Sequence, residues 1–180
     1  MKKFIILILF TSTLFAYESK YSNEKDYSNN DFRIFIGLNA NYGYLNSEQT
    51  NDHSLYSYGL YAGMPIFNDY EIILSKYNSV TSDFTLNQQS LIFNIPLTSR
   101  KTRRVYIGVI AGSGNVDMKN SFINNDEITN KFYGLHIGKR YKFTRNYYVR
   151  IELEALKYEY KDIYEKDTSL IFNYGFEYRF

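Results

Sequence analysis

Apolar and polar side chains alternate along most of this chain, from residue 32 to its end, with a period of two residues. The clearest stretch is residues 169–180, where leucine, phenylalanine and tyrosine occupy one face and mostly small or charged residues the other. Only Ile171 interrupts this pattern. Successive side chains of a β-strand point to opposite faces, whereas a helix would repeat about every 3.6 residues. The alternation therefore predicts strands that each carry one apolar face.

Such segments of about ten residues recur along the chain, each followed by a break in the pattern. Their expected ranges are 32–44, 55–64, 70–78, 84–97, 105–114, 131–141, 147–160 and 169–180. The alternation is ambiguous at residues 87–89, where we expect a β-bulge. The number of segments is even, so both chain ends should lie on the same side of the sheet.

The two faces of these segments differ in a way that separates a membrane barrel from a soluble one. Charged residues share a face with glycines, and the opposite face carries bulky aliphatic and aromatic residues. A soluble barrel of the lipocalin type would instead have an apolar interior and a charged exterior. Lipid cannot hydrogen-bond to open strand edges, so a sheet that contacts a bilayer must close. The pattern predicts an all-β fold, an eight-stranded antiparallel up-and-down transmembrane β-barrel.

Composition agrees with this fold and narrows the function. The chain of 180 residues has 20 tyrosines and 14 phenylalanines but only 2 prolines, which favours strands. Its mean hydropathy of −0.40 argues against a bundle of membrane helices, yet it fits alternating strands. Cysteine is absent, which excludes disulfides and thiolate metal sites. The net charge of +2 gives no reason to expect a nucleic-acid partner.

The N-terminal residues have the pattern of a targeting segment. Lys2 and Lys3 precede an apolar run at residues 4–15, and Ala16 could be the last residue before cleavage. An uncleaved membrane anchor is the alternative. We therefore expect a signal peptide at residues 1–16, a flexible periplasmic leader at residues 17–31 and the barrel domain at residues 32–180.

Charged residues on the inward face are balanced in number. The inward cations and anions are Arg33, Arg140, Arg150, Arg179, Glu71, Glu152, Glu154 and Glu177. Leaving one buried charge unpaired costs about 3–5 kcal/mol, so we predict an interior ion network. For the last two strands we predict the register that places Arg150 opposite Glu177, because the next register stacks Arg150 against Arg179.

The targeting segment, the alternating segments and the aromatic terminal strand together resemble small outer-membrane barrels. The similarity is greatest to the transmembrane domain of the outer membrane protein A family and its porin-family surface-antigen relatives, over about residues 32–180. The resemblance implies a Gram-negative outer membrane, with N- and C-termini in the periplasm and with outer-membrane lipid and lipopolysaccharide around the barrel. It also implies insertion by the barrel-assembly machinery, for which Tyr178 and Phe180 would be the signal.

In that topology, one set of connections faces the periplasm and the other the cell exterior. We expect residues 65–69, 98–104 and 142–146 on the periplasmic side. The expected outer connections are residues 45–54, 79–83, 115–130 and 161–167. Phe122 and Ile123 lie in the longest of them, where they could contact a host or surface partner or fold back over the barrel mouth.

The function expected from these features is non-catalytic, a structural or surface-interaction role through the extracellular loops, without a cofactor. A narrow channel is one alternative, if the inward charges leave water between them. A lipid-A-modifying enzyme is another, and it would use His53 within residues 51–54. His136 points inward, where it could serve a proton path or simply form interior hydrogen bonds. The sequence contains no phosphate loop, zinc-binding spacing or nucleophile elbow.

Overall fold

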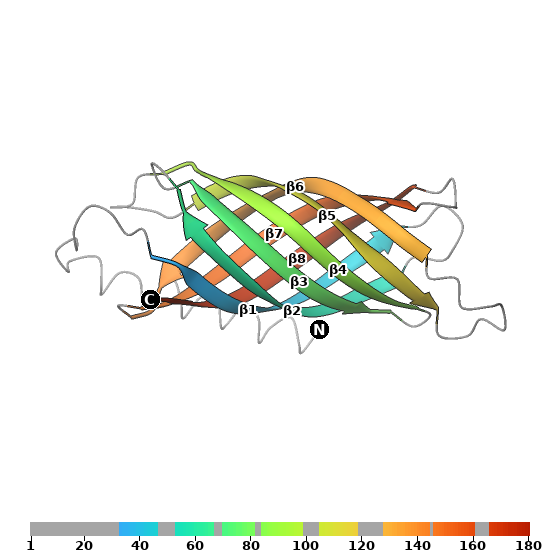
Figure 1. Cartoon of the computed structure of the whole chain (residues 1–180), viewed down its shortest axis with the longest axis horizontal. Coiled ribbons are helices and arrows are strands. Elements are labelled where there is room, and N and C mark those ends of the chain that lie inside the picture. Colours follow the sequence, from blue (N-terminus) through green and yellow to red (C-terminus); the bar gives the residue numbers. More distant parts are fainter. Residues whose placement is uncertain are drawn as a thin grey trace, which may run out of the picture.

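The computed structural model of this chain describes residues 33–46, 53–66, 70–81, 84–98, 105–118, 128–144, 146–160 and 166–180. These residues form a closed barrel (Figure 1). Its strands are β1 (Phe35–Asn46), β2 (His53–Pro65), β3 (Glu71–Val80), β4 (Phe84–Pro96), β5 (Val105–Met118), β6 (Ile128–Lys142), β7 (Tyr147–Tyr160) and β8 (Lys166–Arg179). Within these ranges, no helix is long and apolar enough to cross a membrane.

Each strand pairs in antiparallel fashion with its neighbours in sequence, and β8 closes the barrel against β1. The predicted fold class is therefore confirmed. Several strands are longer than expected, because backbone pairing continues past the apolar part of the strand. For example, Val116 of β5 still pairs with Ile128 of β6, beyond the expected strand ends.

The bulge predicted at residues 87–89 is wrong. Pairing of β4 with both neighbours runs without interruption through these residues. Gln88 points inward and is buried, whereas Asn87 and Gln89 are exposed on the outer face. Strict alternation is thus kept, and it was hidden in the sequence because both faces are polar at this point. Asn87 donates a hydrogen bond to Asp117 of β5 at 3.1 Å on the exposed side.

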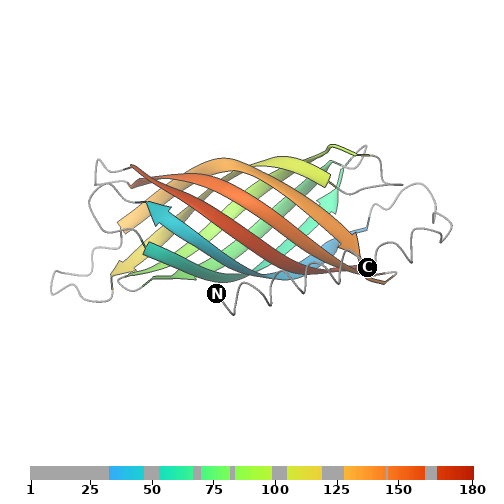
Figure 2. The ribbon, with the colours of Figure 1, turned by 180° about the vertical axis from the view of Figure 1, so that it is seen from behind.

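The strands are staggered as well as closed. A path that starts at Phe35 and follows paired residues through all the strands returns to β1 at Leu45, ten residues further along. Stagger and strand number together fix the tilt of the strands, which run obliquely around the barrel (Figures 1 and 2). A barrel of this size has an interior that side chains can fill.

The outer face carries large exposed apolar side chains on every strand. Among the most exposed are Leu38, Leu60, Leu74, Leu91 and Leu135, the last with 65% of its surface accessible. We call this surface the apolar belt. Monomeric soluble proteins rarely expose a contiguous apolar surface of this extent. The belt is therefore the surface suited to the hydrocarbon of a bilayer.

Aromatic side chains gather at both ends of the belt. At the C-terminal end of the barrel, the ring of Tyr178 packs against two others. Its centroid lies 5.0 Å from that of Tyr147 and 5.1 Å from that of Phe180. At the opposite end, Tyr42 and Tyr56 pack at 5.2 Å. Amphipathic rings at two levels match the girdles of outer-membrane barrels at the two lipid interfaces.

The interior has two zones, and the sequence predicted only one of them. At the end opposite the C-terminus, inward apolar side chains form a compact cluster, here called the apolar plug. Its members are Leu45, Leu55, Leu86, Val116, Phe132, Leu156, Tyr158 and Ile171. They are part of one buried apolar cluster, which Phe35, Tyr61, Ile73, Ile92 and Ile110 continue along the lumen. Ile171 broke the alternation in the sequence because it belongs to this plug. Most of the buried charged residues lie towards the C-terminal end of the lumen, whereas Asp167 lies at the other end.

Glycines make room for the large inward rings. Gly37 of β1 pairs with Tyr61 of β2, and a Cβ on Gly37 would lie 2.2 Å from the tyrosine ring. The same holds for Gly138 of β6 and Tyr106 of β5, where the nearest ring atom would be 2.7 Å away. Pairing of a glycine with an aromatic residue lets a narrow barrel hold rings in its lumen.

Candidate functional site: the ion network inside the barrel

The inward charged side chains of four strands meet near the C-terminal end of the lumen. They come from the start of β3, the end of β6, the start of β7 and the end of β8, which the antiparallel topology brings to one level. These side chains are Glu71, Arg140, Arg150, Glu152, Glu177 and Arg179, and all are buried. Pairing and hydrogen bonding are needed to offset the cost of burying so many charges.

Glu71 is held by two arginines across the lumen. Arg140 donates two hydrogen bonds to its carboxylate, from Nη1 at 2.9 Å and from Nη2 at 2.7 Å. Arg179 donates a third from Nη2 at 2.7 Å, and Asn94 a fourth from Nδ2 at 3.3 Å. Charge-assisted, two-pronged pairs of this kind are among the stronger hydrogen bonds in proteins. Glu71 therefore ties β3 to β6 and β8 through the middle of the barrel.

Glu177 completes the arrangement, with a fully buried side chain. Its Oε1 accepts a hydrogen bond from Nε of Arg179 at 2.6 Å and lies 3.4 Å from Nε of Arg140. Glu71, Arg140, Glu177 and Arg179 thus form a closed cycle in which the charges alternate in sign. We call these four side chains the ion ring.

A second group of charges adjoins the ion ring. Arg150 contacts Glu152 directly through Nη2, and its Nη1 lies 3.9 Å from Oε2 of Glu177. Tyr106 donates a hydrogen bond to Oε1 of Glu152 at 2.7 Å and accepts one from Nε of Arg150 at 3.1 Å. The guanidinium of Arg150 also rests on the ring of Tyr61, 4.8 Å from its centroid.

The rings that cover the guanidinium groups were missed in the sequence. Arg179 lies 4.7 Å from the ring centre of Phe35 and 5.1 Å from that of Tyr148. Cation–π contacts of this kind stabilise desolvated arginines. Parity along the strand could have found Tyr106 and Tyr148, since each occupies an inward position two residues from an inward glycine or arginine.

The predicted register of the last two strands is wrong by one inward step. Arg150 lies opposite Gly175, and Glu177 lies opposite Tyr148. In this register Glu177 reaches three arginines instead of the one that a directly opposite position would offer. Arg150 and Glu177 still meet, but along a diagonal.

Two of the eight charges chosen from the sequence lie apart from this network. Arg33 precedes β1 and donates a hydrogen bond from Nη1 to Asn146 at 3.3 Å, near the C-terminal rim. Glu154 lies deeper in the lumen, and no ion pair to it is recorded among the residues that the structure describes.

Other predicted functional residues lie outside the ranges that the structure describes. These are the N-terminal residues 1–31 and the loop residues Phe122 and Ile123. His53 is the first residue of β2, but its side chain is not described. His136 is buried, its Nδ1 lies 3.5 Å from Oε1 of Glu152, and its Nε2 has no hydrogen-bond partner in the described ranges. It therefore forms no serine–histidine pair there.

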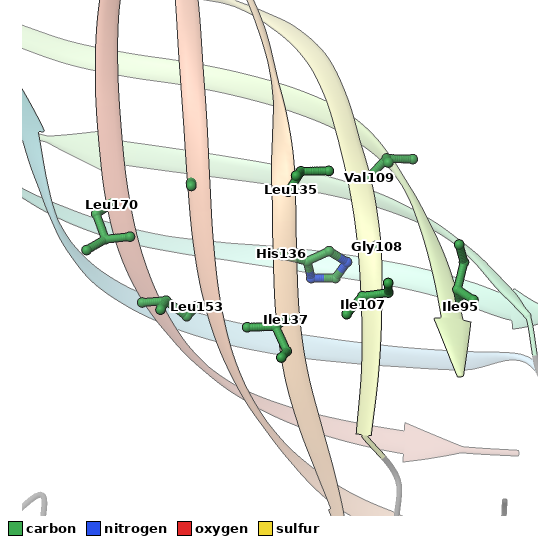
Figure 3. A pocket seen from close by; sticks show the side chains of 10 residues that line it. Ile95, Ile107, Gly108, Val109, Leu135, His136, Ile137, Leu153 and Leu170 are labelled. Atoms are coloured by element: carbon green, nitrogen blue, oxygen red, sulfur yellow. The ribbon is translucent and has the colours of Figure 1, made fainter. Parts of the chain in front are cut away.

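The outer face has a shallow groove of about 360 Å³ over β4 to β8 (Figure 3). Its lining is aliphatic, with Ile95, Ile107, Val109, Leu135, Ile137, Leu153 and Leu170 around it. Gly108 and His136 also border it, and a Cβ on Gly108 would lie 2.0 Å from Nε2 of His136. Nearly all of its surface is apolar, so the groove is a part of the belt that suits a hydrocarbon chain.

No protein-family model matches this sequence, and no curated protein has a significantly similar sequence. Solved structures do match the fold. Neisserial surface protein A aligns with a TM-score of 0.69 at 14% identity, over 82% of this chain and 97% of that chain. Ail, the attachment invasion locus protein of Yersinia pestis, aligns with a TM-score of 0.54 at 13% identity, over 83% of this chain and 100% of the other.

A third match is the outer membrane protein OprG from Pseudomonas aeruginosa, with a TM-score of 0.50 at 11% identity over 82% of this chain and 96% of that chain. At such low identity the likeness shows the fold. The fold is that of the small eight-stranded outer-membrane barrels, as the resemblance in the sequence predicted.

Proposed function

We propose that this protein is a non-catalytic barrel of a Gram-negative outer membrane, with both termini in the periplasm. Its role is structural or one of surface interaction, through the connections at the end of the barrel opposite the C-terminus. The apolar belt supports the membrane location, because only lipid or detergent would cover it. Outer-membrane lipid and lipopolysaccharide are then the immediate surroundings of the barrel.

The observation that carries this proposal is the filled lumen. The ion ring crosses the lumen near one end and the apolar plug occupies the other. A narrow channel needs a continuous path of water, and neither zone favours one. The surfaces left for recognition are then the connections between strands. Such connections carry binding functions in many scaffolds because they tolerate sequence change.

Four connections lie at the end opposite the C-terminus, and the longest joins Met118 of β5 to Ile128 of β6. It contains Phe122 and Ile123 among polar residues, and these are our candidates for contact with a host or surface partner. Ail, one of the structural neighbours, is an attachment invasion locus protein, which is compatible with a contact role for loops on this fold.

The terminal strand supports a role for the barrel-assembly machinery in insertion. Phe180 is 61% exposed at the end of β8, and its ring packs edge-on against Tyr178. An exposed aromatic residue at this end, with a half-buried tyrosine beside it, fits recognition of the strand by a receptor.

We expect the double substitution Phe122→Ser and Ile123→Ser to reduce adherence of cells that display the protein to host cells by about tenfold, or about 1.4 kcal/mol per contact. Apolar side chains at the centre of a contact contribute most to its affinity. The measurement is a count of adherent bacteria, with barrel integrity checked by the gel shift between heated and unheated samples. The control is Asn124→Ser with Asn125→Ser in the same connection. Equal loss in both variants, or none in either, would contradict the proposal.

A further inference from the structure

Among the inward glutamates predicted from the sequence, Glu154 is the one that forms no ion pair with an arginine of the described network. The inward arginines of the network are Arg140, Arg150 and Arg179, and each already contacts Glu71, Glu152 or Glu177. Glu154 is only 3% exposed, and its Oε1 has no hydrogen-bond partner within the described ranges. A buried carboxylate without a cation is costly, so this position calls for a positive charge or a proton.

Two other potential ligands converge on Glu154. His136 of β6 lies directly opposite Glu154 of β7, and Glu152 lies on the same face two residues earlier. One ligand atom from each of these three residues lies within 4.8 Å of the others. Nδ1 of His136 is 3.5 Å from Oε1 of Glu152, and the imidazole is fully buried.

The imidazole and a nearby amide have unused bonding capacity. Nε2 of His136 lacks a hydrogen-bond partner in the part of the chain that the structure describes, and Nδ1 faces Oε1 of Glu152 at 3.5 Å. Asn173 of β8, opposite Glu152, is 1% exposed and lies within reach of Glu154, and its amide oxygen is unpaired there. Buried polar atoms normally have partners, so the unpaired atoms beside Glu154 are available to a bound ion or water.

We propose that His136, Glu152 and Glu154 bind one divalent transition-metal ion of the Zn²⁺ type in the middle of the lumen. Zn²⁺ takes nitrogen and carboxylate oxygen ligands in a four-coordinate site, and the amide oxygen of Asn173 or a water completes the set. The imidazole selects a transition metal over Mg²⁺ or Ca²⁺, which prefer oxygen ligands alone. The sequence alone predicted no metal site, because it has no cysteine and no zinc-binding spacing.

The charges at this point fit an ion. Arg150 neutralises one carboxylate, and the ion supplies the positive charge that Glu154 lacks. A cavity of about 10 Å³ borders Glu154 and is lined by Asn41, Ser57, Tyr77 and Gln88 among others. His136 and Glu152 do not line this cavity, which has room for about one water beside Glu154. Bound there, the metal joins β6 to β7 between the ion ring and the apolar plug, so its binding energy adds to the stability of the barrel.

The test uses the full chain unfolded in urea with EDTA and then refolded into detergent with and without Zn²⁺. We expect one bound zinc per chain by elemental mass spectrometry and a rise of several degrees in the unfolding temperature. Co²⁺ in place of zinc should give a visible absorption band. Absence of both bound zinc and thermal shift would overturn the proposal and indicate a protonated Glu154 instead. Binding of Ca²⁺ or Mg²⁺ without Zn²⁺ would also overturn it.

Matched variants separate a bound metal from a general effect on folding. Glu154→Gln should lose zinc binding and the thermal shift, while its metal-free form unfolds at or above the wild-type temperature because a buried charge is gone. His136→Gln should lose binding as well. Asp167→Asn is the control, since Asp167 is an inward carboxylate, 5% exposed, at the opposite end of the lumen. Wild-type zinc binding by Glu154→Gln, or its loss in Asp167→Asn, would contradict the site.

Discussion

Replacement of Glu71 by alanine is expected to lower the free energy of unfolding by about 3–5 kcal/mol. Glu71 is 4% exposed and accepts hydrogen bonds from Arg140 and Arg179 across the lumen. Its loss leaves two buried guanidinium groups with Glu177 as their one remaining carboxylate in the ion ring. Removing one partner of a buried pair costs more than the pair itself contributes, because the other charge stays desolvated.

The loss is measured by urea unfolding in lipid vesicles. Unfolding is monitored by circular dichroism, because the chain has no tryptophan for fluorescence. Glu159→Ala is the matched control, since Glu159 is an exposed carboxylate on the outer face of β7. We expect little change in the control. A loss below about 1 kcal/mol for Glu71→Ala, the scale of surface ion pairs, would show that the ion ring does not hold the barrel together.

Substitution of Leu135 by arginine should have the second large effect. Leu135 lies in the middle of β6, 65% exposed, between Val109 and Ala155 of the neighbouring strands. An arginine on the lipid face near the middle of a bilayer destabilises a barrel by about 2–4 kcal/mol. In a soluble protein the same change at an exposed site would alter stability by no more than about 0.5 kcal/mol.

Thr129→Arg is the control for this substitution. Thr129 is exposed on the same face of the same strand, near its start and beyond the apolar belt. The expected cost falls to about 0–1 kcal/mol there, as near a bilayer interface. The measurement is the free energy of unfolding in lipid vesicles for both variants. Equal costs at residues 129 and 135 would mean that the belt has no hydrocarbon around it.

Alternation in the sequence was enough to predict the strands, their order and the face of most side chains. It failed where both faces have the same polarity, as at residues 87–89, and where an apolar residue points inward. Ile171 looked like an exception to the pattern, yet it belongs to the interior core, as does Phe35. Such inward apolar residues fill the narrow lumen. The sequence around each one does not show which other inward residues it contacts.

The contacts within the ion network could not be predicted from the sequence. Parity places Glu71 and Arg140 on the inward face but says nothing of their level along the barrel axis, which depends on the register of every strand between them. For β7 and β8, parity allows several registers that differ by two residues. In the observed register Glu177 contacts Arg140 of β6, which lies outside the hairpin. His136 and Glu154 likewise meet only through the pairing of two strands.

The central claim is that one face of the closed sheet meets lipid and the other encloses the ions. Nuclear Overhauser effects between methyl groups and lipid chains in nanodiscs test it without any mutation. Leu74 and Leu91 should show contacts to acyl-chain methylenes, whereas Ile73 and Ile92, one residue away and 0% and 2% exposed, should show none. Acyl-chain contacts at Ile73 and Ile92, with water contacts at Leu74 and Leu91, would contradict the account.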